Sequence, residues 1–242
     1  VLSHEVGHTL SLMHNMAGSS SIPVESLRDP KFTQEYGTTY SIMDYARNNY
    51  IAQPGDKEKG VRMTPPELGA YDYYAISWLY KPIFEAKTSE EEIPILDKWI
   101  SEKSGDPKYR YGKQQFKRRF DPSSVEEDLG DDPVKASEYG RRNLQYILKH
   151  INEWVADKDK DFEFRSALYD EIVYGYVRYL SFVLADIGGI YLNERYDGDQ
   201  RPSYKTVSKE QQKKALNFLL NELKDLSWLD ANETLKEFPI RT

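Results

Sequence analysis

Apolar positions in the first twelve residues recur at the spacing of a helix face. Leu2, Val6 and Leu10 are four residues apart, which brings their side chains to one side of an α-helix. The small and polar run AGSSSIP at 17–23 interrupts this pattern, and residues 23–62 are punctuated by proline and glycine. The pattern predicts a helix within residues 1–12, followed by a long region of loops.

The middle of the chain predicts one helix and little other regular structure. Thr64 can cap a helix that has Glu67 in its first turn, and the run LGAYDYYAISWLY extends this helix to about Tyr80. The rest of this region, up to residue 132, is predicted to be irregular except for short strands at EEIPIL (91–96) and YRYG (109–112).

Helical periodicity returns in the last half of the chain. Residues 134–155 place their leucines and isoleucines on one face, while residues 162–187 are apolar on more than one face. We predict that the second of these helices is the centre of a bundle and packs against the helix that ends at Tyr80. The other expected elements are a hairpin over 188–207 that turns at Asp197-Gly198, a helix over 209–225 capped by Ser208, and a short helix over 228–237.

These elements predict a mainly α chain with at most short strands, divided near residue 120. Residues 1–120 would form one unit, and residues 121–242 a helical C-terminal region. Val1 lies directly inside the apolar helical pattern, with neither an initiator Met nor a capping residue before it. We therefore expect the chain to be a piece of a longer protein.

Composition and charge exclude several classes of function. The net charge of −7 repels a phosphate backbone, and the one basic run, KQQFKRRF at 113–120, is followed at once by acidic residues. No apolar run approaches the roughly 20 residues that a membrane-spanning helix needs. The chain has no cysteine, which excludes thiol catalysis and thiolate metal sites. We expect neither nucleic-acid binding nor a transmembrane segment.

The residues with the clearest chemistry lie at the start of the chain. His4 and His8 form the pattern H-E-x-x-H, and residues four apart on a helix lie close enough for two imidazoles to reach one metal ion. Glu5 lies beside them, where a carboxylate can take a proton from a water. Of the four histidines in the chain, three fall within eleven positions, so a chance grouping is a poor explanation.

The third of these histidines requires a break in the helix. His14 follows His8 by six residues, which on a continuing helix would turn it about 240° away from the pair. It can join them only if the helix stops and the chain turns back near Ser11. If Ser11 occupies that turn, we predict that its φ is positive or that the turn is distorted.

The segment HEVGHTLSLMH resembles the metzincin metalloproteases, whose motif H-E-x-x-H-x-x-G-x-x-H supplies three zinc ligands and a general base. The resemblance implies that His4, His8 and His14 bind Zn²⁺ and that Glu5 is the base. Ser11 stands where the family has glycine, and a serine with positive φ costs about 1–2 kcal/mol that glycine avoids.

A second segment extends this resemblance. SIMDY at 41–45 is similar to the Met-turn of metzincins, which makes Met43 an apolar floor under the zinc and Tyr45 a phenol for the metal or the oxyanion. Together with LGAYDYYAISWLY at 68–80, it resembles the Met-zincin family of large secreted bacterial proteins.

The family resemblance implies a zinc metalloendopeptidase acting on protein or peptide substrates, secreted or in the cell envelope. It also implies that the chain is the C-terminal part of an α+β catalytic domain followed by a helical bundle. Because His4 falls in the first helical turn, where ends fray, we expect this chain by itself to bind zinc weakly and to be inactive.

Two other hypotheses remain open. A gluzincin-type peptidase would take its third ligand from a glutamate in E-x-x-x-D, which the segment ESLRD supplies as Glu25 and Asp29. A non-catalytic helical interaction module would retain the motif and have lost its metal.

Overall fold

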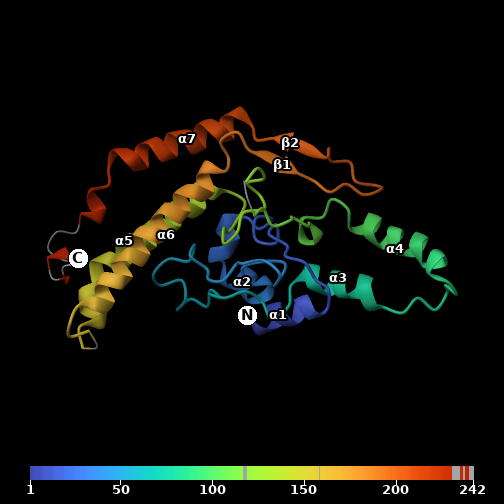
Figure 1. The fold of residues 1–242 in the computed structure, drawn as a ribbon, viewed down its shortest axis with the longest axis horizontal. Coiled ribbons are helices and arrows are strands. Elements are labelled where there is room, and N and C mark those ends of the chain that lie inside the picture. The colour runs from blue at the N-terminus through green and yellow to red at the C-terminus, as the bar shows by residue number, and fades with distance from the viewer. Residues whose placement is uncertain (117–118, 158, 231–234, 237, 240–242) are drawn as a thin grey trace.

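The computed structural model describes residues 1–116, 119–157, 159–230, 235–236 and 238–239, and this part of the chain is mainly helical. Figure 1 shows short helices and long loops around the N-terminus, with a pair of long helices on one side and an extended arm on the other. The prediction of a mainly α chain with short strands is confirmed. Within the described residues, no helix is long and apolar enough to cross a membrane.

The helices and strands follow the chain in this order: α1 (Leu2–Thr9), η1 (Val24–Arg28), α2 (Pro30–Tyr36), α3 (Ala70–Tyr80), α4 (Ser89–Lys103), η2 (Pro107–Tyr109), α5 (Pro133–Val155), α6 (Glu163–Leu184), β1 (Ile190–Leu192), β2 (Tyr204–Thr206), α7 (Lys209–Lys224) and η3 (Ser227–Leu229). The strands β1 and β2 pair antiparallel, with Tyr191 opposite Lys205. The predicted hairpin and the three long C-terminal helices are thus confirmed. Of the short helix predicted over 228–237, residues 231–234 and 237 lie outside the described residues.

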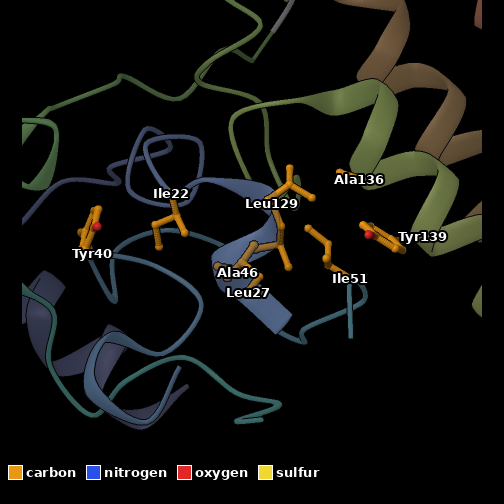
Figure 2. Packing of buried hydrophobic residues seen from close by; sticks show 9 residues of the cluster. Ile22, Leu27, Tyr40, Ala46, Ile51, Leu129, Ala136 and Tyr139 are labelled. Atoms are coloured by element: carbon orange, nitrogen blue, oxygen red, sulfur yellow. The ribbon is translucent and has the colours of Figure 1, made fainter. Parts of the chain in front are cut away.

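The N-terminal half is built around a buried apolar cluster that the loops enclose. Figure 2 shows Leu27 and Ile51 beside Leu129, which lies in the loop before α5, while Ile22 lies further along the same cluster toward Tyr40. Ala136 and Tyr139 of α5 complete the same cluster, whose other members are Val24, Tyr40 and Ala46. The first turns of α5 therefore pack against the loop region rather than standing apart from it.

The C-terminal half is a helical layer. α5 and α6 pack along one another in an antiparallel pair, and α7 lies across α6 (Figure 1). The buried side chains between them include Leu144, Leu148 and Ile172, as the apolar face of residues 134–155 predicted. Asp132 begins α5 by accepting a hydrogen bond from the Lys135 amide, and Ser208 begins α7 in the same way.

The helix expected from Thr64 begins six residues later. Pro66 disfavours the helical conformation at the residue before it, Pro65, so two consecutive prolines keep this segment extended. The helix begins instead at Ala70, where the Asp72 side chain accepts a hydrogen bond from the Gly69 amide.

The two short strands expected between residues 81 and 132 are absent from the described residues. EEIPIL lies inside α4, because Thr88 caps that helix and three glutamates stabilise its first turn. In YRYG, Tyr109 ends η2, and the next three residues are extended without a strand partner.

The expected packing of the central helix is also wrong. α6 packs against α5 and α7, whereas α3 packs on η2. The last residue of α6 also lies outside the core. The side chain of Leu184 is 57% exposed, so a charged residue in its place would remain in contact with water.

Candidate metal centre

α1 carries two histidines whose rings are fixed from outside the helix. His4 Nδ1 lies 2.7 Å from the Ile42 carbonyl oxygen, and His8 Nδ1 lies 2.9 Å from that of Leu12. A carbonyl oxygen only accepts, so each Nδ1 carries the proton and donates it. The Nε2 atom of each ring is then unprotonated, which is the state that binds a metal ion.

The turn after α1 brings the third histidine back to this pair. The Ser11 amide donates to the His8 carbonyl and the Leu12 amide donates to the Gly7 carbonyl, both at 3.0 Å. This pattern ends a helix with one residue in the left-handed region, and Ser11 has φ 64°. The prediction of a positive φ at Ser11 is confirmed, and the chain reverses so that His14 returns toward His8.

His14 is oriented by residues far along the sequence. Its Nδ1 donates to Gln114 Oε1, while Gln114 Nε2 donates to Glu126. The Glu126 carboxylate thereby fixes which end of the Gln114 amide faces the histidine. No local signal in the sequence indicates this pair, because both residues lie about a hundred positions from His14.

The three rings converge on one point. His8 Nε2 and His14 Nε2 are 3.1 Å apart, and one ligand atom from each of the three histidines lies within 4.8 Å of the others. Zinc–nitrogen bonds of 2.0–2.1 Å in a tetrahedron separate the nitrogens by about 3.3 Å. The donor set and its spacing therefore fit a zinc ion held by His4, His8 and His14.

Burial sets the charge state of His4, which is half-buried. The pKa of His4 is lowered from its ordinary value, chiefly because burial disfavours the charged ring, and the nearby His8 and His14 act in the same direction. The hydrogen bond to Ile42 opposes this shift. His4 is therefore held in the neutral form that a metal ion requires.

Met43 forms the floor beneath the histidines. Its side chain is fully buried and packs with Leu12 and Ile42. A Cβ atom added at Gly7 would lie 2.5 Å from Met43 Sδ, so only glycine at this position lets α1 approach the sulfur so closely. The Met-turn and the histidine helix are thus in direct contact.

Asp72 of α3 holds the Met-turn in place, and sequence reasoning missed it. Its carboxylate is buried and accepts hydrogen bonds from Ser41 Oγ (2.8 Å) and the Ile42 amide (2.9 Å), besides that of Gly69. Since the Ile42 carbonyl orients His4, Asp72 acts on the site through one further residue.

Tyr45 and Glu5 both act on the histidine cluster. The Tyr45 hydroxyl is 3.0 Å from His14 Nε2 and can donate to it. Glu5 is exposed on α1 between the two histidines, and its charge raises the pKa of His4, as the hydrogen bond to Ile42 does.

Glu25 is committed to a different part of the molecule. It pairs with Lys135 Nζ at 2.6 Å and accepts a hydrogen bond from the Tyr139 hydroxyl at 2.9 Å. Asp29 caps α2 by accepting from the Lys31 amide. Neither side chain joins the histidine cluster, so the structure offers no support for the E-x-x-x-D ligand.

A cavity of about 440 Å³ adjoins the turn at Ser11. It lies between α3, the end of α4 and the β1–β2 connection, and its wall combines charged residues with aromatic ones, among them Tyr71, Tyr74, Trp78 and Tyr111. It contains none of the three histidines.

Three convergent imidazoles form a group that could hold a metal ion, with Met43 buried beneath them. The family model of the Met-zincins matches residues 1–241, and the chain belongs to this family. Comparison with the curated proteins and with the solved structures gives no match.

Proposed function

We propose that this chain carries the catalytic centre of a zinc-dependent endopeptidase. The observation that supports this most strongly is the convergence of three Nε2 atoms, each left unprotonated by an oxygen acceptor on the opposite ring nitrogen. Membership of the Met-zincin family supports zinc as the metal. When bound, the zinc ion supplies Lewis-acid chemistry, polarising the scissile carbonyl and making a water more acidic.

The residues around the histidines supply the remaining steps. Glu5 is exposed on α1 between the two histidines, where it accepts a proton from the attacking water and passes it to the leaving amine. Tyr45 has its hydroxyl directed at the cluster, where it donates a hydrogen bond to the oxyanion of the tetrahedral intermediate. Met43 and Asp72 act by position, because neither reaches the reacting atoms.

The test is a comparison of Glu5→Gln with the wild-type chain for zinc content and for hydrolysis of casein. In the form of the protein that is extended upstream, we expect one zinc per chain with and without the substitution, and loss of hydrolysis by a factor of at least about 100 in the variant, because glutamine cannot accept the proton. Replacement of His8 by Ala is the companion variant and should lose both zinc and activity. The same pair is measured in a version of the protein extended upstream.

The non-catalytic module is the second hypothesis that this experiment tests. A protein that holds no zinc at micromolar concentrations and hydrolyses nothing, in both the given and the extended forms, contradicts the peptidase. Zinc binding without any difference between Glu5→Gln and wild type contradicts the role given to Glu5.

A further inference from the structure

An exposed arginine lies against the tyrosine of the Met-turn. The Arg47 amide donates a hydrogen bond to the Tyr45 carbonyl at 2.8 Å, which folds the chain into a tight turn. Ala46, between them, is 1% exposed and packs in the apolar cluster of the loop region (Figure 2). The turn brings Arg47 back over its neighbour, and the guanidinium carbon lies 5.4 Å from the centre of the Tyr45 ring.

Tyr45 connects this arginine to the metal centre. The ring centres of Tyr45 and His14 are 4.8 Å apart. Together with the 5.4 Å between the Tyr45 ring and the guanidinium carbon, this allows at most about 10 Å between Arg47 and the His14 ring. An extended peptide advances about 3.3–3.6 Å per residue. A peptide with its scissile carbonyl at the histidines can therefore bring a side chain within three residues of that bond to Arg47.

Arg47 belongs to a group of three charges that is positive overall. Its Nη2 lies 3.2 Å from Glu127 Oε1, and the other oxygen of that carboxylate pairs with Arg178 of α6. One carboxylate thus faces two guanidinium groups. The Arg47 side chain is 67% exposed, whereas those of Glu127 and Arg178 are 23% and 35% exposed. Arg47 is therefore the member of the group that is most open to a ligand.

The loop before α5 fixes the position of Glu127 and through it that of Arg47. Glu127 has φ 65°, in the left-handed region that a residue with a Cβ atom rarely adopts. Its neighbours hold the loop, since Glu126 accepts a hydrogen bond from Gln114 and the Leu129 amide donates to the Tyr50 hydroxyl. The same loop therefore orients His14 through Glu126 and Arg47 through Glu127.

The chemistry of Arg47 suits a carboxylate. A guanidinium group has five N–H donors and binds a carboxylate by two parallel hydrogen bonds. Contact with one oxygen of Glu127 leaves donors of Arg47 for a second carboxylate. An ion pair as exposed as that of Arg47 with Glu127 is weak, so it does not prevent a second carboxylate from binding.

We propose that Arg47 binds a carboxylate of the substrate within three residues of the scissile bond, so that the protein prefers acidic peptides. This inference rests on the proposed peptidase function and names the substrate class of that site. Two sources share this chemistry, an Asp or Glu side chain and a free C-terminus. Because an endopeptidase cleaves away from the chain ends, the side chain is the expected source.

The experiment compares matched peptides in the form of the protein that is extended upstream. Each pair of ten-residue peptides differs by Glu or Gln at one position within three residues of the cleaved bond, which mass spectrometry locates. We expect kcat/KM to be about tenfold higher for the Glu peptide at one of these positions, through a lower KM. The preference should decrease as salt is added, because exposed charges are screened.

Three variants make the test specific. Arg47→Gln should lower the ratio of the two kcat/KM values to about one. Arg47→Lys should keep part of the preference, because lysine keeps the charge but not the two parallel donors. Arg142→Gln is the matched control, since Arg142 is also exposed and its guanidinium carbon lies 5.4 Å from the Tyr139 ring. It should keep the wild-type ratio.

A binding measurement separates this inference from the peptidase function. Fluorescence anisotropy gives the Kd of labelled Glu and Gln peptides for Glu5→Gln, alone and combined with Arg47→Gln. The Glu peptide should bind about tenfold more tightly to the first protein and like the Gln peptide to the second. A protein that shows this preference and hydrolyses nothing contradicts the proposed function and retains the role of Arg47.

The proposal is overturned if wild type treats the Glu and Gln peptides alike, or if its preference survives in Arg47→Gln. An equal loss of activity on both peptides in Arg47→Gln also overturns it, because the arginine then acts on Tyr45 and not on the substrate. A further peptide carries Gln and ends at the same distance from the cleaved bond, either as the free acid or as the amide. A preference for the free acid without one for Glu supports Arg47 and assigns the carboxylate to the chain end.

Discussion

Ser11 holds a backbone conformation that suits glycine better than serine. Its φ of 64° lies in the left-handed region, where the Cβ atom of an L-residue meets the following carbonyl oxygen. We expect Ser11→Gly to raise the free energy of unfolding by about 1 kcal/mol and to strengthen zinc binding, because the turn that returns His14 is relieved of strain. Chemical denaturation and a zinc titration measure the two effects.

Ser11→Ala is the control for that substitution. Alanine keeps the Cβ atom and removes only the hydroxyl, so it should stay close to wild type in stability and zinc affinity. Equal stability of the glycine and alanine variants would contradict the strain at this turn.

The ionisation of Asp44 gives a pH dependence of stability. Burial raises the pKa of Asp44 to about 7, against about 3.9 in an unfolded chain, so the folded state binds the proton more tightly. Stability from this group is therefore gained as pH falls through 7 and is lost above it. Wild type should gain free energy of unfolding relative to Asp44→Asn between pH 8 and pH 5, by an amount on the order of 2 kcal/mol.

The comparison with Asp44→Asn is needed because His4 acts in the opposite direction. Its pKa is lowered in the folded state, so His4 makes folding less favourable as pH falls through the ordinary histidine range. Both proteins share that contribution, and the difference between them isolates Asp44. A difference that does not change between pH 8 and pH 5 would show that Asp44 titrates normally.

Some residues of the candidate site could be predicted from the sequence, and others could not. His4, His8 and His14 could be grouped from their spacing, because a helix and one forced turn relate them to each other. Gln114, Glu126 and Asp72 could not, because nothing local links them to the histidines. Their roles follow from tertiary contacts that only the folded chain brings together.

At the scale of elements, the Met-turn depends on α3. Asp72 lies in the first turn of α3, and its carboxylate is the acceptor for donors in Ser41 and Ile42. We expect Asp72→Ala to lower the free energy of unfolding by about 2–4 kcal/mol, because it leaves buried donors without an acceptor. Zinc affinity should fall as well, since the Ile42 carbonyl would no longer hold His4. Denaturation and zinc titration measure these losses.

Asp97→Ala is the matched control for Asp72. Asp97 lies on α4, which contains no buried residue, and its carboxylate contacts the exposed Tyr196. The control should change stability by less than about 1 kcal/mol and should bind zinc like wild type. Normal zinc affinity in a folded Asp72→Ala protein would separate α3 from the metal centre.

The helices that were predicted correctly have a clear capping residue at the N-terminal end and a strong apolar face. Asp132 and Ser208 each cap a helix with a strong apolar face, and the structure has both helices within a residue of the expected start. Thr64 offered a similar cap, but the two prolines after it prevented the helix. EEIPIL was read as a strand because its four apolar residues are too few to show a period, whereas the cap at Thr88 decided its structure.

At the scale of the whole molecule, the metal centre and the helical layer share a core. Leu129, Ala136 and Tyr139 lie beyond residue 120, yet they pack with Ile22 and Ile51 of the loop region. A boundary near residue 120 stays a prediction, and a composition change along the sequence could not indicate contacts across it. The loop between Gln114 and α5 belongs to both parts, because it carries Glu126 toward His14 and Leu129 into the core.

This shared core gives a prediction about two leucines at different distances from the site. Leu129 is 1% exposed and packs among the loops, while Leu144 is 8% exposed and packs between α5 and α6. We expect Leu129→Ala and Leu144→Ala each to lower the free energy of unfolding by about 2–4 kcal/mol, because both leave a cavity. Only Leu129→Ala should also weaken zinc binding, by about tenfold, since its loop positions Glu126 and through it the amide that orients His14.

Measuring zinc affinity well below the unfolding temperature of each variant separates the two effects. At that temperature both proteins are folded, so a change in zinc Kd reports the geometry of the site rather than the population of folded chain. Wild-type zinc affinity in both variants would mean that the loop before α5 does not position the histidines. A loss of affinity in Leu144→Ala of the same size would mean that the helical layer and the metal centre respond as one cooperative unit.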